Sequence, residues 1–296
     1  MSQSELLNRF FDCVSYKRAR PWQKPLLNPR RFVLNQMQKY RLLPSNLGEL
    51  RVTSTFHLPE FTIVTGEAVS EQIRSYGVYE ESLTEAFLHL VKPRQVVVDI
   101  GMHVGYYATL FACLVGEEGK VHAFEPTPST REIAQRNLRG FSQVTVHPQA
   151  VWSSIETLAF RDFGVKWMAF NSFTAAKMEL DSPPPHVIEV KTITLDSFRS
   201  TLGRTVSLVK IDAESAEEEI LKGAGNFLRQ DQPLLSIEVG DSGRERSSRR
   251  LIDRLCSLNY SPWQMESGKF SPHQPRECYV YDNLIFAPSE QDLSQS

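Results

Sequence analysis

The sequence has few cysteines, no long apolar run and almost no net charge. Its cysteines lie far apart and show no metal-ligand spacing; they are Cys13, Cys113, Cys256 and Cys278. We therefore expect free thiols in a cytoplasmic protein, and neither a disulfide framework nor a zinc site. No apolar run approaches the roughly 18 residues of a membrane span, and the first residues lack the basic-then-apolar layout of a signal peptide. The formal net charge of −2 gives no reason to expect a nucleic-acid partner.

What the sequence does have is an ordinary globular composition. Its 296 residues are 41% hydrophobic and 23% charged, which is enough for one large domain or two small ones. No internal repeat is visible. The function therefore has to come from local motifs and their order along the chain.

The most informative segment runs from Val96 to Glu125. Three consecutive valines suit a strand that is buried on both faces, as in a parallel sheet. Asp99, Gly101 and Gly105 follow, then a helix-like run, and then a second short apolar run that ends at Glu125. The pattern predicts strand, tight turn, helix and strand, the unit that holds nucleotide-like ligands in doubly wound α/β folds.

Each position in this unit has a physical role. Gly101 and Gly105 leave the backbone bare, so the chain can turn and a ligand can approach closely. The helix that follows points its free N–H groups and positive dipole end at the ligand, which favours an anionic group such as a carboxylate. Glu125 offers two oxygens to the two hydroxyls of a ribose.

A second block places carboxylates at the same edge of the predicted sheet. Leu208 to Gly225 begins as a strand that ends near Asp212, with Glu214 directly beyond it. Pro233 to Val239 predicts a further strand that ends at Glu238. Three carboxylates at one edge are a possible divalent-metal site, but no histidine or asparagine pattern supports one, and we expect no metal.

These blocks together resemble the FkbM family of methyltransferases. That family typically shows Asp-Ile/Val-Gly-Ala-Asn-Ile/Val-Gly-Tyr-Tyr, and this chain has DIGMHVGYY. AFEPTP matches the family's Phe-Glu-Pro-x-Pro, and KIDAESAEE is similar to Lys-Ile-Asp-Val-Glu-Gly-x-Glu. DNLIFAP resembles its C-terminal strand. The resemblance covers about residues 76 to 287.

The resemblance implies an α/β fold of the Rossmann-like class I methyltransferase type. It implies a mostly parallel seven-stranded sheet, with a reversed final strand and helices on both faces. The implied cofactor is S-adenosyl-L-methionine, and the implied reaction is O-methylation of a hydroxyl on a small molecule, a sugar, a natural-product intermediate or a carrier-bound substrate. The cofactor-binding residues expected are Asp99, Gly101, His103, Gly105, Glu125, Pro126, Ala150, Val151 and Asp212.

Methyl transfer needs an acceptor oxygen in line with the methyl group and a group that takes the acceptor's proton. Asp212 and Glu214 are the first candidates for orientation and for the base. His103 is the other candidate base, because imidazole titrates near neutral pH; its alternative role is that of a hydrogen-bonding strut.

Two other functions stay open at this point. A nicotinamide-dependent Rossmann oxidoreductase would show G-x-G-x-x-G, and that spacing is missing here. A catalytically degenerate methyltransferase-like binding protein is the second. Met102, His103 and Ser215 speak for it, since the family has alanine, asparagine and glycine there.

The rest of the chain is expected to frame this domain. Residues 1–75 predict an N-terminal extension or cap, residues 76–288 the FkbM-like domain, and residues 289–296 a disordered tail. Lys17 to Arg51 holds nine Lys and Arg against one acid, which indicates a solvated basic face or a surface for an anionic partner.

Three local predictions concern the domain itself. Ser82 and Glu85 predict a helix capping box. Val144–Val151 predicts one strand, and residues 153–193 an excursion that serves as a substrate flap.

Overall fold

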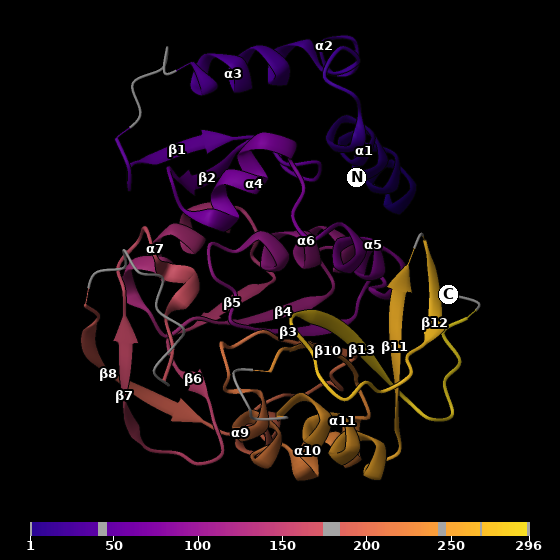
Figure 1. Cartoon of the computed structure of the whole chain (residues 1–296). Coiled ribbons are helices and arrows are strands. Elements are labelled where there is room, and N and C mark those ends of the chain that lie inside the picture. Colours follow the sequence, from indigo (N-terminus) through magenta and orange to yellow (C-terminus); the bar gives the residue numbers. More distant parts are fainter. Residues whose placement is uncertain (1, 41–45, 174–183, 242–246, 267, 295–296) are drawn as a thin grey trace.

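The fold is built around one large sheet covered by helices on both faces. The computed structural model describes residues 2–40, 46–173, 184–241, 247–266 and 268–294. Figure 1 shows α5, α6 and α7 on one side of the sheet, α9, α10 and α11 on the other, and a further N-terminal layer outside α5 and α6. No helix in these ranges is long and apolar enough to cross a membrane.

The main sheet has eight strands, one more than expected. Their order is β12 (Lys269–Pro272), β11 (Tyr260–Glu266), β13 (Asp282–Pro288), β10 (Leu234–Val239), β9 (Leu208–Ile211), β3 (Val96–Ile100), β4 (Lys120–Phe124) and β5 (Val144–His147). The five strands from β10 to β5 are parallel, and β13 is antiparallel to both of its neighbours. The predicted Rossmann-like sheet with a reversed final strand is therefore confirmed. Its extra strand β12 pairs with β11 at the edge.

Helices bury both faces of this sheet. One face packs against α5 (Glu81–Leu90), α6 (Tyr106–Val115) and α7 (Pro128–Asn137), the other against α8 (Leu195–Arg199), α9 (Glu217–Lys222), α10 (Gly225–Asp231) and α11 (Ser247–Ser257). Val97 and Val98 point to opposite faces and belong to two separate core clusters. Both valines are fully buried, as the continuous apolar run predicts for a central parallel strand.

A small second sheet corrects the prediction for Val144–Val151. The chain forms two strands there, β5 and β6 (Ala150–Val151), and Pro148 lies between them. Proline has no N–H to donate to a sheet ladder, so the main-sheet strand stops at His147. β6 instead pairs with β8 (His186–Ile193), and β8 pairs with β7 (Thr157–Asp162). These strands and the 3-10 turn η1 (Met168–Phe170) form the expected excursion, of which residues 174–183 lie outside the described residues.

The N-terminal layer packs onto the domain and shares its core. It consists of α1 (Gln3–Arg18), α2 (Lys24–Leu27), α3 (Pro29–Lys39), β1 (Leu50–Thr53), β2 (Phe61–Val64) and α4 (Ala68–Tyr76). Leu6 and Phe10 of α1 lie in the same buried cluster as Phe87 of α5 and Phe111 of α6. The layer thus buries its apolar residues against the domain instead of forming a core of its own.

Two local expectations differ from the structure. The N-cap of helix α5 is Glu80, at φ 41°, two residues before the expected cap Ser82, and no side chain caps the helix. The tail expected to be disordered is held in place through residue 294. Leu293 is fully buried in the main core, and the Ser289 N–H donates to the carbonyl of Asn259 at 2.8 Å.

Asn137 joins the N-terminal layer to the domain. Its amide accepts from the Thr62 N–H at 2.6 Å and donates to the carbonyls of Thr62 and Val104, both at 2.9 Å. We expect Asn137→Ala to lower the free energy of unfolding by about 2 kcal/mol, because three buried backbone groups lose their partner. Urea unfolding measures this. The control is Asn8→Ala, at an exposed position of α1. Equal stability of the two variants would contradict the role of Asn137.

Candidate active site

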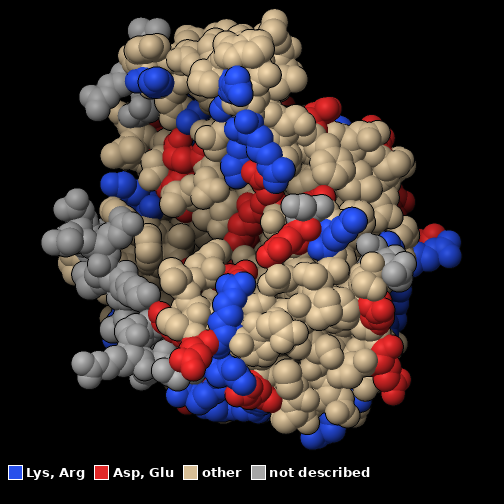
Figure 2. All heavy atoms as spheres, turned by 45° about the vertical axis from the view of Figure 1, so that its right-hand side comes forward, with Lys and Arg blue, Asp and Glu red and all other residues tan. Residues whose placement is uncertain are grey.

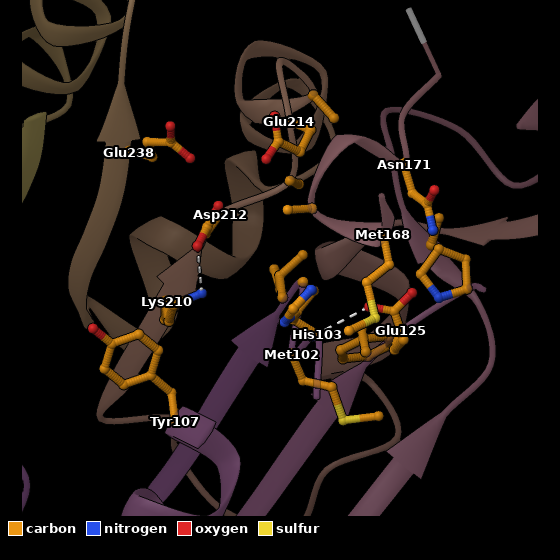
Figure 3. Close-up of a pocket in the computed structure, with 18 of the residues that line it drawn as sticks. Met102, His103, Tyr107, Glu125, Met168, Asn171, Lys210, Asp212, Glu214 and Glu238 are labelled. Carbon is orange, nitrogen blue, oxygen red and sulfur yellow. Dashed lines mark hydrogen bonds and ion pairs between the residues drawn. The ribbon is translucent and has the colours of Figure 1, made fainter. Parts of the chain in front are cut away.

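A cavity of about 180 Å³ lies at the carboxyl edge of the main sheet, where β3, β4, β9 and β10 end. Figure 3 shows side chains from these strand ends pointing toward one another, with Lys210, Asp212, Glu214 and Glu238 on one side and Met168 and Glu125 on the other. Ligands of open parallel sheets bind at this edge, so the location agrees with the sequence-based prediction.

The turn after β3 requires its glycines. Gly101 has φ 78°, and a Cβ there would lie 1.8 Å from the carbonyl oxygen of Asp212. Gly105 has φ 85° and immediately precedes α6. The Gly101 and Met102 N–H groups both donate to the carbonyl of Phe124 at 3.1 Å. The turn is therefore fixed from two sides, by the end of β4 and by the segment after β9.

His103 is held in the same turn at φ 52°, a region that asparagine and glycine adopt more readily than histidine. Its ring lines the cavity, and Nε2 has no hydrogen-bond partner among the described residues. Glu67 Oε1 is the closest carboxylate, at 3.9 Å. Burial lowers the pKa of His103, although Glu67 and Asp212 oppose the shift. The shift favours a neutral ring at neutral pH, and within the described residues His103 is not a hydrogen-bonding strut at Nε2.

Glu125 follows β4 and is almost fully buried. One carboxylate oxygen accepts from the His103 N–H at 3.2 Å, and the other accepts from the Thr127 N–H at 2.9 Å. Burial raises the pKa of Glu125 to about 7 against these hydrogen bonds. Each oxygen retains a second lone pair, so both remain available to hydroxyl groups of a ligand.

Apolar side chains form the wall next to Glu125. Ala150 and Val151 of β6 line it, as expected, together with Phe160 of β7 and Met168 of η1. No motif in the sequence pointed to Met168. Phe160 is the one buried residue of β7, next to exposed Ala159, and the alternation of a strand predicts its inward direction. This wall suits a flat, uncharged ring.

Lys210 organises the polar side of the cavity. Its ammonium is buried and lies 3.0 Å from Asp212 Oδ2 and 3.6 Å from Asp99 Oδ1. It also lies 5.2 Å from the centre of the Tyr107 ring. Burial lowers the pKa of Lys210, but the two carboxylates outweigh it and raise the pKa above its usual value. Lys210 is therefore a permanent cation, and it is the only lysine or arginine among the described lining residues.

Three carboxylates meet beyond Lys210. Oxygens of Asp212, Glu214 and Glu238 all lie within 4.8 Å of one another. Burial raises the pKa of Asp212, but Lys210 outweighs it and keeps that pKa below the usual range. Burial and the charge of Asp212 raise the pKa of Glu214 to about 8 and that of Glu238 to about 11. At neutral pH Asp212 is thus the ionised member, and Glu214 and Glu238 hold protons.

The same three residues are those weighed as metal ligands from the sequence, and the structure brings them together. Magnesium and calcium take six or more oxygen ligands, so these carboxylates fill only part of such a shell.

Glu80, the N-cap of α5, holds two tyrosines that line the cavity, Tyr107 and Tyr281. Its carboxylate accepts from the Tyr107 hydroxyl and from Asn283 Nδ2, both at 2.8 Å, and from the Tyr281 hydroxyl. Burial and the charge of Asp212 raise the pKa of Glu80. Its partners in α6 and after β12 could not be paired without the fold.

Most of the predicted site residues line one cavity: Gly101, His103, Glu125, Pro126, Ala150, Val151, Asp212 and Glu214. Asp99 and Gly105 do not. Asp99 is fully buried beneath the turn, its carboxylate oxygens accept no hydrogen bond from the described residues, and it serves as a counter-ion of Lys210. Gly105 lies behind the turn, where a Cβ would contact Ala134 at 3.4 Å.

Comparison with known proteins decides the family. The model of the methyltransferase FkbM domain matches residues 99–262, more than half of the chain. The chain belongs to the FkbM methyltransferase family. The matched residues include the turn after β3, Glu125 and the carboxylates at the ends of β9 and β10, so the family's domain contains most of the cavity. This assignment favours a methyltransferase over the nicotinamide-dependent oxidoreductase.

Solved structures resemble this FkbM protein at low identity. Methyltransferase FkbM from Methylobacillus flagellatus KT is 17% identical, with 73% of this chain and 52% of that chain covered and a TM-score of 0.39. Aeropyrum pernix fibrillarin, in complex with natively bound S-adenosyl-L-methionine, is 12% identical, with 81% and 99% covered and a TM-score of 0.42. A S-adenosylmethionine-dependent O-methyltransferase from Thermotoga maritima is 14% identical, with 84% and 80% covered and a TM-score of 0.39. No curated protein sequence matches the chain.

The raised pKa of Glu214 makes stability depend on pH. Its pKa is about 8 in the folded protein against 4.5 in an unperturbed carboxyl. The stability that protonated Glu214 contributes is therefore full below about pH 4.5 and is lost as the pH rises through about 8. We expect Glu214→Gln to gain stability relative to the wild type over this range, measured by urea unfolding at each pH. Glu117→Gln, at an exposed position, is the control. A pH-independent difference for Glu214→Gln would contradict the assignment.

Proposed function

We propose that this FkbM-family protein binds S-adenosyl-L-methionine in the cavity and methylates a hydroxyl oxygen of a small-molecule or carrier-bound acceptor. The observation that carries the proposal is the division of the cavity into two parts. An apolar wall and Glu125 lie at the ends of β4 and β6, and the carboxylates with Lys210 lie at the ends of β9 and β10. A ligand with a neutral ring, a sugar and a cationic centre fits this division.

The residues present fit the cofactor. Ala150, Val151 and Phe160 would hold the adenine ring, and Glu125 would accept hydrogen bonds from the ribose hydroxyls. The turn after β3 and the first N–H groups of α6 would bind the carboxylate of the amino-acid part. The surplus of carboxylates over cations would stabilise the positive sulfonium. When bound, the cofactor supplies an electrophilic methyl group.

The chain's own residues would prepare the acceptor. Asp212 is ionised at neutral pH, because Lys210 holds its pKa down, and it is placed to take the proton of an acceptor hydroxyl. Glu214 and Glu238 carry protons in the ligand-free protein, and their carboxyl groups would orient the acceptor through hydrogen bonds. This divides the roles that Asp212 and Glu214 shared in the sequence-based prediction. His103 stays a second candidate base.

The departures from the family pattern do not favour a non-catalytic binding protein. Ser215, where the family has glycine, takes the left-handed conformation at φ 74°. This costs strain of order 1 kcal/mol, which the surrounding fold absorbs. Met102 packs against Ala108, Ala123 and Ala134 in a small buried cluster.

Calorimetric titration tests the cofactor. We expect the wild type to bind S-adenosyl-L-methionine and its demethylated product at micromolar concentrations, and not to bind NAD. Glu125→Gln should weaken binding at least tenfold, since an amide has one acceptor oxygen in place of two. Glu117→Gln is the matched control. Binding of NAD alone would refute the proposal, and unchanged affinity in Glu125→Gln would refute the ribose assignment.

The reaction is tested with S-adenosyl-L-methionine that carries an isotope-labelled methyl group. The wild type is incubated with a small-molecule extract, and mass-spectrometric fragmentation locates the label. We expect it on oxygen. Asp212→Asn should slow transfer about 100-fold or more, as for loss of a general base, while its affinity for the cofactor changes little.

Three outcomes would contradict parts of this proposal. Label on nitrogen would exclude the hydroxyl acceptor. Cofactor binding without any labelled product would favour the binding protein. Undiminished transfer in Asp212→Asn, with Glu214→Gln as the comparison, would move the base to another residue such as His103.

A further inference from the structure

The helices α2 and α3 expose an unusual number of large apolar side chains. Between positions 22 and 40 six of them are more than two-fifths exposed: Trp22, Leu26, Leu27, Val33, Leu34 and Tyr40. Leu26 is 78% exposed and Trp22 is 64% exposed. We call these six residues the α2–α3 surface. Figure 1 places α2 and α3 at the outer end of the molecule, beyond α4 and β1.

The polarity of α3 is the reverse of that of an ordinary surface helix. Its inward side carries polar residues: buried Arg31 donates to the Ser54 carbonyl at 2.9 Å, and Asn35 donates to the Ser75 carbonyl at 3.0 Å. Its outward side carries Val33 and Leu34. A helix of a globular domain normally turns its apolar stripe to the core. The hydrogen bonds on the inner side hold α3 in this orientation, so the apolar residues stay outside.

Basic side chains accompany the apolar ones. Arg20, Arg30 and Lys39 are exposed, and Lys39 lies 5.8 Å from the centre of the Tyr40 ring. The only acid between Lys17 and Arg51 is Glu49, which lies 3.8 Å from Arg51. Figure 2 shows blue Lys and Arg side chains within a mostly tan surface at this end of the molecule. The whole chain has a net charge of −2, so the positive charge here is local.

We propose that the α2–α3 surface binds the surface of a lipid bilayer that contains anionic lipids. Apolar side chains enter the boundary between headgroups and acyl chains, and neighbouring Lys and Arg pair with lipid phosphates. Tryptophan and tyrosine are enriched at this boundary in membrane proteins, because one end of each ring system is polar, and the surface contains Trp22 and Tyr40. A single partner, the bilayer, thus contacts both the apolar and the basic side chains of this region.

A second copy of the chain is a poorer partner. A two-fold contact would place the same surface on both sides, so the basic side chains of both copies, Arg20, Arg30 and Lys39, would lie in one interface. The described residues of α2 and α3 include no acid that could compensate this repulsion. An acidic protein would satisfy the charge but would also need a complementary apolar groove.

Vesicle co-sedimentation tests the proposal with the full chain. We expect binding to phosphatidylcholine vesicles that contain about 30% phosphatidylglycerol, weak binding to phosphatidylcholine alone, and weakening by salt. The double variant Leu26→Asp, Leu27→Asp should bind at least tenfold more weakly. Its matched control is Ile155→Asp, Val187→Asp, since Ile155 and Val187 are 69% and 67% exposed but lie elsewhere on the molecule.

Tryptophan fluorescence gives a second reading. Vesicles should shift the emission of the wild type to shorter wavelength, and Trp22→Phe should remove the shift. Calorimetric binding of S-adenosyl-L-methionine by each variant shows that it is folded. No vesicle binding by the wild type, or equal binding by the two double variants, would overturn the proposal. Light scattering could instead show that the wild type is a dimer and that the double variant Leu26→Asp, Leu27→Asp is a monomer. That result would overturn the proposal and identify a second copy of the chain as the partner.

Discussion

The ion cluster of Lys210 with Asp99 and Asp212 is the interaction on which the site depends. It joins the central strands β3 and β9 at the edge where the cavity lies, and the ammonium also contacts the face of Tyr107 from α6. Removing one member of a buried ion pair typically costs about 3–5 kcal/mol, because the remaining charge has no partner. Loss of the Lys210 charge would leave two buried carboxylates without a cation. The folded protein therefore keeps Lys210 protonated. Through it, Asp212 stays ionised while its neighbours hold protons.

A second constraint works on the backbone and reinforces the first. Gly101 and the carbonyl of Asp212 are in such close contact that any side chain at position 101 would collide with it. The turn after β3 therefore positions the segment after β9, and the same contact keeps Asp212 beside Lys210. Glu125 extends this arrangement, because it accepts the His103 N–H and so ties the end of β4 to the turn. The geometry of the cavity thus follows from a few contacts between three strand ends.

The sequence was most informative where one physical demand dominates. Continuous apolar runs predicted the central strands, and the spaced glycines with Glu125 predicted the turn and its edge of the sheet. It was least informative where several weak demands compete. Pro148 stopped a strand that periodicity continued, and Leu293 anchors a tail whose composition is polar. Glu80 takes its importance from Tyr107, Tyr281 and Asn283, which are distant in sequence and meet only in the folded chain.

The carboxylates at the ends of β9 and β10 also have to share one buried cavity. Several ionised carboxylates cannot be buried together, because each costs solvation and repels the others. The protein resolves this by keeping protons on Glu214 and Glu238, with Lys210 compensating Asp212. A cationic ligand supplies the missing positive charge in place of those protons, since a nearby cation lowers a carboxyl pKa. The affinity of the cavity for a cation and the protonation of its carboxyl groups therefore depend on the same electrostatic balance.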